Sequence, residues 1–293
     1  MSTEQGRARL FDLGYRSYDG PRERPARALV TLAGFTARRV LGLGRGARHK
    51  VLPAVTLVIA FIPALVSVAF SVIIDVVQVD DLISYGDYMF IIGGALALFA
   101  SLIAPEALCP DRRSGMLGLY LAGPLDRVRY LAAKGGAVLA VMLLITVGPL
   151  LFMLVAFVLA GHGPTAGETP GLLLRILASG VVTALLYTSL SMAVSSFTTR
   201  RAAAAVATVL LLFVPVSVVR SAIESAGAPN ALDLLSFPFV VADLSYRIFG
   251  ETPGDNAPVR ELSTGLIAGG VAAAIAAGIL VCWLRYRRLE AFR

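Results

Sequence analysis

Six apolar stretches divide this chain of 293 residues, and they constrain its fold more than any other feature. They cover residues 51–74, 88–105, 135–160, 172–197, 202–219 and 262–284. Their only charged residue is Arg175, which lies close to one end of its stretch. Each stretch has about 18 residues or more, enough for a helix to cross the roughly 30 Å hydrocarbon core of a bilayer. The sequence therefore predicts an all-α, polytopic membrane protein with six transmembrane helices.

The basic residues between these stretches are concentrated in alternate gaps. The segments 1–50, 107–134, 198–201 and 285–293 hold 22 of the 26 Lys and Arg residues. Because loops rich in Lys and Arg stay on the cytoplasmic side during membrane insertion, we expect these segments to face the cytoplasm. Both termini are then cytoplasmic, which agrees with an even number of spans.

Composition supports a membrane domain and argues against several other classes of protein. The chain is 57% hydrophobic and only 15% charged, so most of it is expected to contact lipid or other helices. Its net charge of +7 follows the predicted inner membrane face, which argues for anionic lipid and against nucleic acid as a partner. Arg outnumbers Lys by 24 to 2, as is typical of GC-rich bacterial genomes, so we expect a bacterial plasma membrane protein.

The residues before the first stretch contain no apolar run of signal-peptide type, so Met1 is expected to remain in the cytoplasm. Both cysteines, Cys109 and Cys282, fall on that side, where a disulfide is not expected. We divide the chain into a cytoplasmic segment, 1–50, and a six-helix transmembrane domain, 51–293.

Residues 26–47 have the pattern of an amphipathic helix lying in the inner membrane interface. One face would carry Arg27, Arg38 and Arg45, and the other would be apolar. The apolar face comprises Leu29, Leu32, Thr36, Val40 and Leu43. An ordinary solvated basic linker is the alternative.

The predicted outer segment 220–261 is long and contains an apolar part, Leu232 to Phe249, that is too polar to span. Polar or helix-breaking residues interrupt it at Asp233, Pro238, Asp243 and Arg247. Short helices that dip into the outer leaflet and an amphipathic helix on its surface both fit this pattern.

The sequence lacks the motifs of a nucleotide hydrolase or a membrane protease. A P-loop needs Lys directly after Gly, but Lys50 follows His49 and Lys134 follows Ala133. No His-Glu-x-x-His motif occurs, and we expect neither catalytic residues nor a metal site. Secondary carriers usually bury ionisable groups between their helices, and the centres of these stretches have none. A secondary transporter or a channel is therefore the second hypothesis.

The segment 106–134 predicts two short helices that form an elbow parallel to the membrane. Ser114 is a plausible N-cap for the first helix, which would stop before Gly123, and Asp126 is a cap for the second. Apolar positions available for packing are Leu117, Leu121 and Leu125. Arg112, Arg113, Arg127 and Arg129 are available to a partner, and the alternative is that they are only topology determinants.

This elbow resembles the signature of ABC-2 type transporter permeases, a Glu followed by Arg-x-x-Gly-Thr-Leu, Leu-Leu, Pro-Leu-Ser-Arg and Lys. The matching residues are Glu106, Arg112, Gly115, Leu117, Leu121, Pro124, Leu125, Arg127 and Lys134. Met116 stands where Thr is usual, and Asp126 stands where Ser or Thr is usual.

The resemblance implies a permease subunit of an exporter. The elbow would contact a separate ATPase chain that binds ATP and Mg, and two permeases would assemble with two ATPases. This chain would bind no cofactor of its own.

Two further patterns concern the inside of the bundle. Polar residues recur every four positions in the fourth stretch and could line the pathway or a subunit seam, or bond to carbonyls of their own helix. They are Ser179, Thr183, Tyr187, Ser191 and Ser195. Ladders of small residues, which include Gly93, Gly265 and Gly269, predict close helix packing.

Overall fold

The computed structural model describes residues 25–44, 46, 48–73, 84–122, 125–161, 163–251 and 262–288. Across these residues the chain is helical and contains no strand. The helices are α1 (Pro25–Val40), α2 (Arg48–Ile73), α3 (Tyr85–Arg113), α4 (Met116–Ala122), α5 (Arg127–Leu159), α6 (Thr169–Ser195), α7 (Arg201–Ala226), the 3-10 helix η2 (Asn230–Leu235), α8 (Phe237–Phe249) and α9 (Thr264–Arg288).

Six of these helices, α2, α3, α5, α6, α7 and α9, are long and apolar enough to cross a membrane, which confirms the six predicted spans. Three of them run well beyond the limits of the apolar stretches, since α3 continues to Arg113, α7 continues to Ala226, and α5 begins at Arg127. An apolar stretch marks only the part of a helix that suits the hydrocarbon core, whereas α3 and α7 continue until a left-handed glycine ends them. Gly115 (φ 71°) follows the end of α3, and Gly227 (φ 61°) caps α7.

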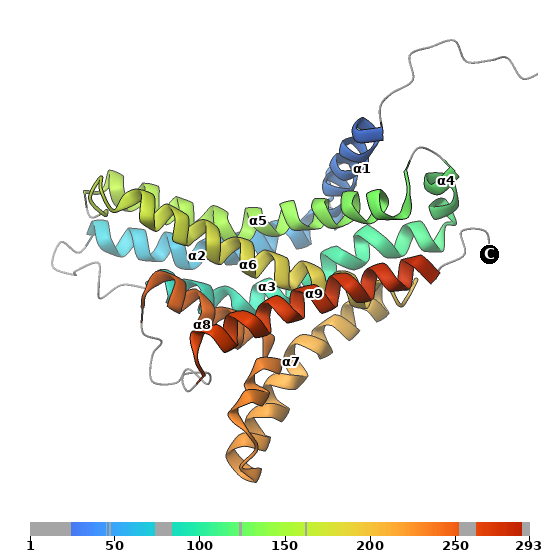
Figure 1. Ribbon diagram of the computed structural model, residues 1–293. Coiled ribbons are helices and arrows are strands. Elements are labelled where there is room, and N and C mark those ends of the chain that lie inside the picture. Colours follow the sequence, from blue (N-terminus) through green and yellow to red (C-terminus); the bar gives the residue numbers. More distant parts are fainter. Residues whose placement is uncertain are drawn as a thin grey trace, which may run out of the picture.

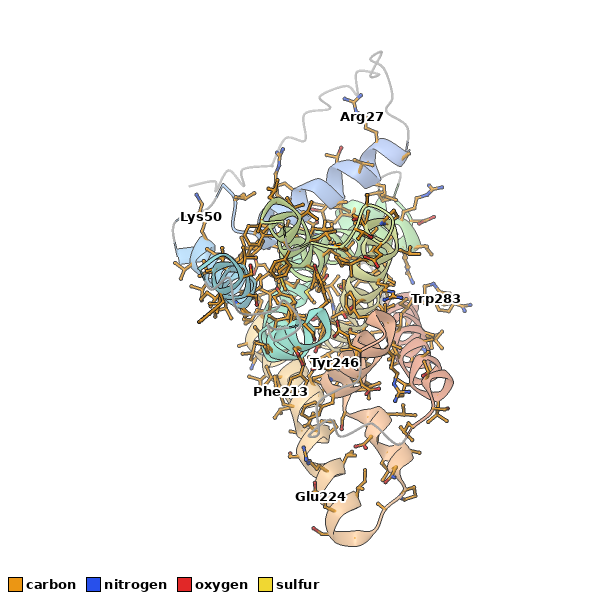
Figure 2. All side chains as sticks on the ribbon, turned by 90° about the vertical axis from the view of Figure 1, so that its left-hand side faces the viewer. Arg27, Lys50, Phe213, Glu224, Tyr246 and Trp283 are labelled. Carbon is orange, nitrogen blue, oxygen red and sulfur yellow. The ribbon has the colours of Figure 1, made fainter. Side chains whose placement is uncertain are left out.

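The long helices form a bundle whose centre is occupied by α3, α5 and α6 (Figure 1). One end of this bundle carries Arg113, Arg127, Arg201 and Arg288, and we call it the basic end. Helix α4 lies at the basic end, on the right of Figure 1. Helix α7 diverges from the bundle, so that Glu224 near its end lies at the lower extremity of Figure 2.

Helix α1 crosses α5 near the basic end and packs on it with one face (Figure 1). Leu32, Thr36 and Val40 are buried, whereas Arg27 and Arg38 are exposed, as the amphipathic pattern predicts. Leu43, expected on the same apolar face, is instead exposed, because α1 ends at Val40 and the chain then turns. The position of α1 in a membrane interface stays a prediction, and Arg45 lies outside the described residues.

Beyond α7, the chain returns to the bundle as η2 and α8, and α8 packs among α3, α6 and α9. Glycine at position 86 allows this approach, since a Cβ there would lie 2.3 Å from the Tyr246 ring. The Tyr246 hydroxyl donates to Asp87, and the Gly86 amide donates to Glu251 Oε2 at 2.8 Å. Arg175 Nη1 donates to the Phe249 carbonyl at 2.7 Å. Helix α8 is therefore enclosed largely by protein, while its depth in a bilayer stays a prediction.

Candidate functional site

The basic end contains an ion pair that is almost completely withdrawn from solvent. Lys134 Nζ on α5 lies 2.7 Å from Asp111 Oδ2 on α3, and the two side chains are 1% and 3% exposed. The Tyr130 hydroxyl donates to the same carboxylate oxygen at 3.1 Å. A buried charge must be paired and hydrogen-bonded to be tolerated, so this cluster fixes the position of α5 against α3.

Further charged residues extend this pair to two more helices. Arg39 on α1 contacts Asp111 Oδ1 at 3.3 Å and Glu106 Oε1 at 3.5 Å. The other Glu106 oxygen pairs with Arg201, the first residue of α7. We call these five residues, Arg39, Glu106, Asp111, Lys134 and Arg201, the charged network. It connects α1, α3, α5 and α7 at the basic end.

Two predicted arginines bind the carboxyl ends of other helices. Arg112 donates to the carbonyls of Ser196 and Thr198 just after α6. Arg127 donates to the carbonyls of Tyr286 and Arg287 in the last turn of α9. Carbonyls at a helix end lack intrahelical donors and carry partial negative charge, so each guanidinium stabilises the helix it meets. Arg113, by contrast, is exposed.

The predicted elbow corresponds to α4, the turn at Gly115 that precedes it, and the start of α5. Gly115 (φ 71°) reverses the chain between α3 and α4, and Asp126 caps α5 by accepting from the Arg129 amide at 2.7 Å. The expected N-cap at Ser114 is wrong, because Ser114 is the C-cap of α3 and its amide donates to the Pro110 carbonyl. Glu106 and Arg112 consequently lie on α3 and not in a loop. Pro124 is outside the described residues.

Helix α4 has one face toward the bundle and one toward solvent. Leu117 and the adjoining Leu125 are buried, and Leu121 is half-buried against the core. On the other face, Leu119 is 68% exposed and Met116 is 38% exposed. The described helices of the chain therefore leave Met116 and Leu119 of α4 uncovered.

A single aromatic residue connects α4 to the charged network. The Tyr120 ring lies 5.8 Å from Lys134 Nζ and 5.8 Å from the Tyr130 ring. Burial raises the pKa of the Tyr120 hydroxyl, Asp111 raises it further, and Arg39 lowers it. The hydroxyl therefore stays protonated at neutral pH, and the neutral ring presents its face to the ammonium group.

A family model described as ABC-2 family transporter protein matches residues 43–250, which include every helix from α2 to α8. The chain belongs to the ABC-2 transporter family. It is thus a multi-pass membrane protein and a permease of the ABC transporter type, a class of membrane component that associates with an ABC ATPase subunit. No curated protein matches the chain.

Sequence reasoning about this permease found Lys134 and Glu106 but missed their partners. Asp111, Arg39 and Arg201 belong to the charged network although no motif marks them. Charge balance offered one signal, since Glu106 and Asp111 are the only acidic residues between the second stretch and Asp126. Two carboxylates beside so many basic residues are expected to pair with some of them, but the sequence does not say with which.

The polar stripe on α6 lies inside the permease's own bundle. Ser191 and Ser195 donate to the carbonyls of Tyr187 and Ser191 on their own helix. The Tyr187 hydroxyl donates to the Gly93 carbonyl of α3 at 3.3 Å, and the Ser179 hydroxyl donates to Ser245 of α8 at 2.9 Å. Thr183 is also buried. In this conformation the stripe holds α6 against α3 and α8.

Close contacts between helices also occur at glycines outside the predicted ladders, while Gly93 of those ladders is buried on α3. A Cβ at Gly180 of α6 would lie 2.4 Å from Val147 on α5, and one at Gly278 of α9 would lie 2.8 Å from the Ser189 backbone. Gly265 and Gly269 are exposed, and a Cβ there would contact nothing within 4 Å. The ladder on α9 therefore faces away from the chain's own helices.

Proposed function

We propose that this permease forms one half of an ABC exporter's translocation pathway, and that α4 receives the force of ATP hydrolysis from a separate ATPase subunit. ATP and Mg would be bound by that partner, and the basic end would face the cytoplasm of a bacterial cell. The observation that supports this proposal best is the position of α4. Its exposed face carries Leu119, and its other face reaches the charged network through Tyr120.

A partner can drive a permease only through contacts that differ between two conformations. Displacement of α4 would move the Tyr120 ring relative to Lys134, and the charged network would pass that displacement to α1, α3, α5 and α7. The ammonium group is almost completely buried, so it cannot exchange its protein partners for water at low cost. We therefore propose that the network moves as one unit when the ATPase changes state.

A second permease copy would complete the pathway. The outward ladder of α9 and the divergent helix α7 both leave apolar surface outside the bundle, including Val206, Leu210 and Val218. These surfaces support assembly of two permeases, as a homodimer or as a heterodimer.

Copurification with a coexpressed candidate ABC ATPase from the same organism tests the proposal. Replacing Leu119 with Gln should abolish capture of the ATPase, whereas Leu232→Gln, at an exposed position on η2, should leave it intact. Equal capture by both variants would contradict the assignment of α4.

The Gly115→Ala variant tests the same proposal by measuring ATP hydrolysis and transport. Its left-handed backbone disfavours any side chain by about 1–2 kcal/mol, so the elbow should shift and ATP hydrolysis should become uncoupled from transport. Gly94→Ala is the matched control, because a Cβ at either glycine would contact nothing within 4 Å and Gly94 lies within helix α3.

The buried Lys134–Asp111 pair favours one other function, a carrier that moves protons or ions without ATP. Vesicles containing the purified permease alone distinguish the two. Transport without any ATPase would support the carrier and contradict the proposal above.

A further inference from the structure

An apolar groove of about 330 Å³ runs between α5, α6 and α9 toward the basic end. Val128 and Trp283 line it nearest the basic end, and Leu139 and Thr188 line it farther along the helices. From Val128 to Leu139, α5 rises about 17 Å at 1.5 Å for each residue. The groove thus extends about half the thickness of a bilayer's hydrocarbon core.

Glycines keep the groove open. Gly135 and Gly136 provide no side chain on the α5 wall, and a Cβ at Gly136 would have nothing within 4 Å. Gly278 brings α9 against the backbone of Ser189, so the floor is closed while the outer side is not. Because the groove is open on one side and three helices long enough to span a membrane form its walls, surrounding lipid can enter it.

The ends of the groove differ in chemistry. Thr188, at the deeper end, is 7% exposed, and its hydroxyl has no hydrogen-bond partner among the residues that the structure describes. At the other end, Arg129 follows Val128, and the Arg287 guanidinium lies 5.5 Å from the Trp283 ring. Arg127, Arg285 and Arg288 add positive charge there, and the Asp126 carboxylate lies 3.9 Å from Arg129 Nε.

We propose that this groove binds one anionic phospholipid, independently of whether an ATPase drives transport. An acyl chain fits the apolar walls, with its ester near the basic end and its methylene groups extending toward Thr188. The phosphate then meets Arg129 and Arg287, which attract anionic headgroups. Trp283 occupies the level at which tryptophan favours the boundary between lipid and water. The positive charge selects an anionic lipid over a zwitterionic one.

Trp283 is the only tryptophan of the chain, so its fluorescence reports directly on this groove. It lies at the periphery of the bundle, on the side opposite Lys50 (Figure 2). The full-length permease is reconstituted in vesicles with a small fraction of phosphatidylglycerol or phosphatidylcholine that carries bromine on its upper acyl chain. Bromine quenches tryptophan only on close approach, and each sample is compared with the same unbrominated mixture.

We expect brominated phosphatidylglycerol to quench Trp283 at lower mole fractions than brominated phosphatidylcholine. Each arginine near the headgroup should contribute a preference of roughly five-fold, so Arg129→Gln/Arg287→Gln should remove most of it. Gly136→Leu fills the groove and should reduce quenching by both lipids. Gly94→Leu, at an exposed glycine on α3 that does not line the groove, should leave the quenching and the preference unchanged.

Three results would overturn the proposal. Equal quenching by the two lipids would show ordinary contact with the surrounding bilayer. A preference that survives both the arginine and the Gly136→Leu substitutions would place the lipid elsewhere. Absence of quenching by either lipid would show that protein, such as a second copy of the permease, covers the groove.

Discussion

Replacing Lys134 with Met should destabilise the permease far more than the loss of an exposed ion pair does. Lys134 and Asp111 are 1% and 3% exposed, and removing one member of a buried pair generally costs about 3–5 kcal/mol. Arg39 and the Tyr130 hydroxyl still contact the Asp111 carboxylate in the variant, so the lower end of that range applies. About 3 kcal/mol corresponds to a roughly hundred-fold change in the unfolding equilibrium.

The comparison pair is Arg220–Glu224 on α7, whose side chains are 50% and 62% exposed. Glu224→Gln should cost no more than about 1 kcal/mol, because exposed pairs gain little over their interactions with water. Unfolding in mixed micelles, followed by loss of helical circular dichroism as denaturing detergent is added, measures both changes on one scale.

A double-mutant cycle identifies the source of the effect. Asp111→Asn combined with Lys134→Met leaves no unpaired charge between α3 and α5. The double variant should therefore lose less stability than the sum of the losses measured for the two single variants. The expected coupling energy is about 2 kcal/mol. Strictly additive losses, or a Lys134→Met effect no larger than that of Glu224→Gln, would refute the interpretation of the pair as a buried junction.

Two other substitutions test contacts away from the basic end. Gly180→Ala should lower stability by about 1–3 kcal/mol because its Cβ would overlap a side chain of α5. Gly171→Ala, on the same helix, places its Cβ in open space and should be neutral or stabilising. Thermal unfolding would distinguish the two variants. Tyr246→Phe removes a hydrogen bond to the Asp87 carboxylate and should lower stability by about 1.5–3 kcal/mol. Tyr88→Phe, which removes a hydrogen bond to the neutral carbonyl of Ala60, should lower stability by less. A larger loss of stability for Tyr88→Phe in the same assay would contradict the charged character of the Tyr246 bond.

The spans could be predicted from sequence because the length of an apolar run is a local property. The N-cap of α5, Asp126, and the buried face of α1 were also local features, since both depend on residues within a few helical turns. The charged network that joins the helices was not a local feature. Arg39 and Glu106 are 67 positions apart, and Arg201 and Glu106 are 95 apart, so their pairing depends on how whole helices pack.

The packing glycines show the same limit in another form. Gly269 and Gly278 look alike in sequence, because α9 is rich in Gly and Ala on every face. Only the tilt of α9 against α6 brings Gly278 to the Ser189 backbone and turns Gly269 outward. Small residues permit close approach, but the neighbouring helix determines where that approach occurs.

Helix α3 joins the two polar ends of the permease. Asp111 at its basic end belongs to the charged network, and Asp87 at its other end holds Tyr246 of α8. Between them, α3 packs on α2, α5, α6 and α7 through apolar and small side chains. Apolar contacts have no preferred direction, whereas charged ones do. A push on α4 should therefore tilt α3 against its neighbours with little loss of interaction in the middle. The free-energy cost of this motion then arises mainly at the two ends of α3, where the hydrogen bonds of Asp111 and Asp87 must be kept or broken.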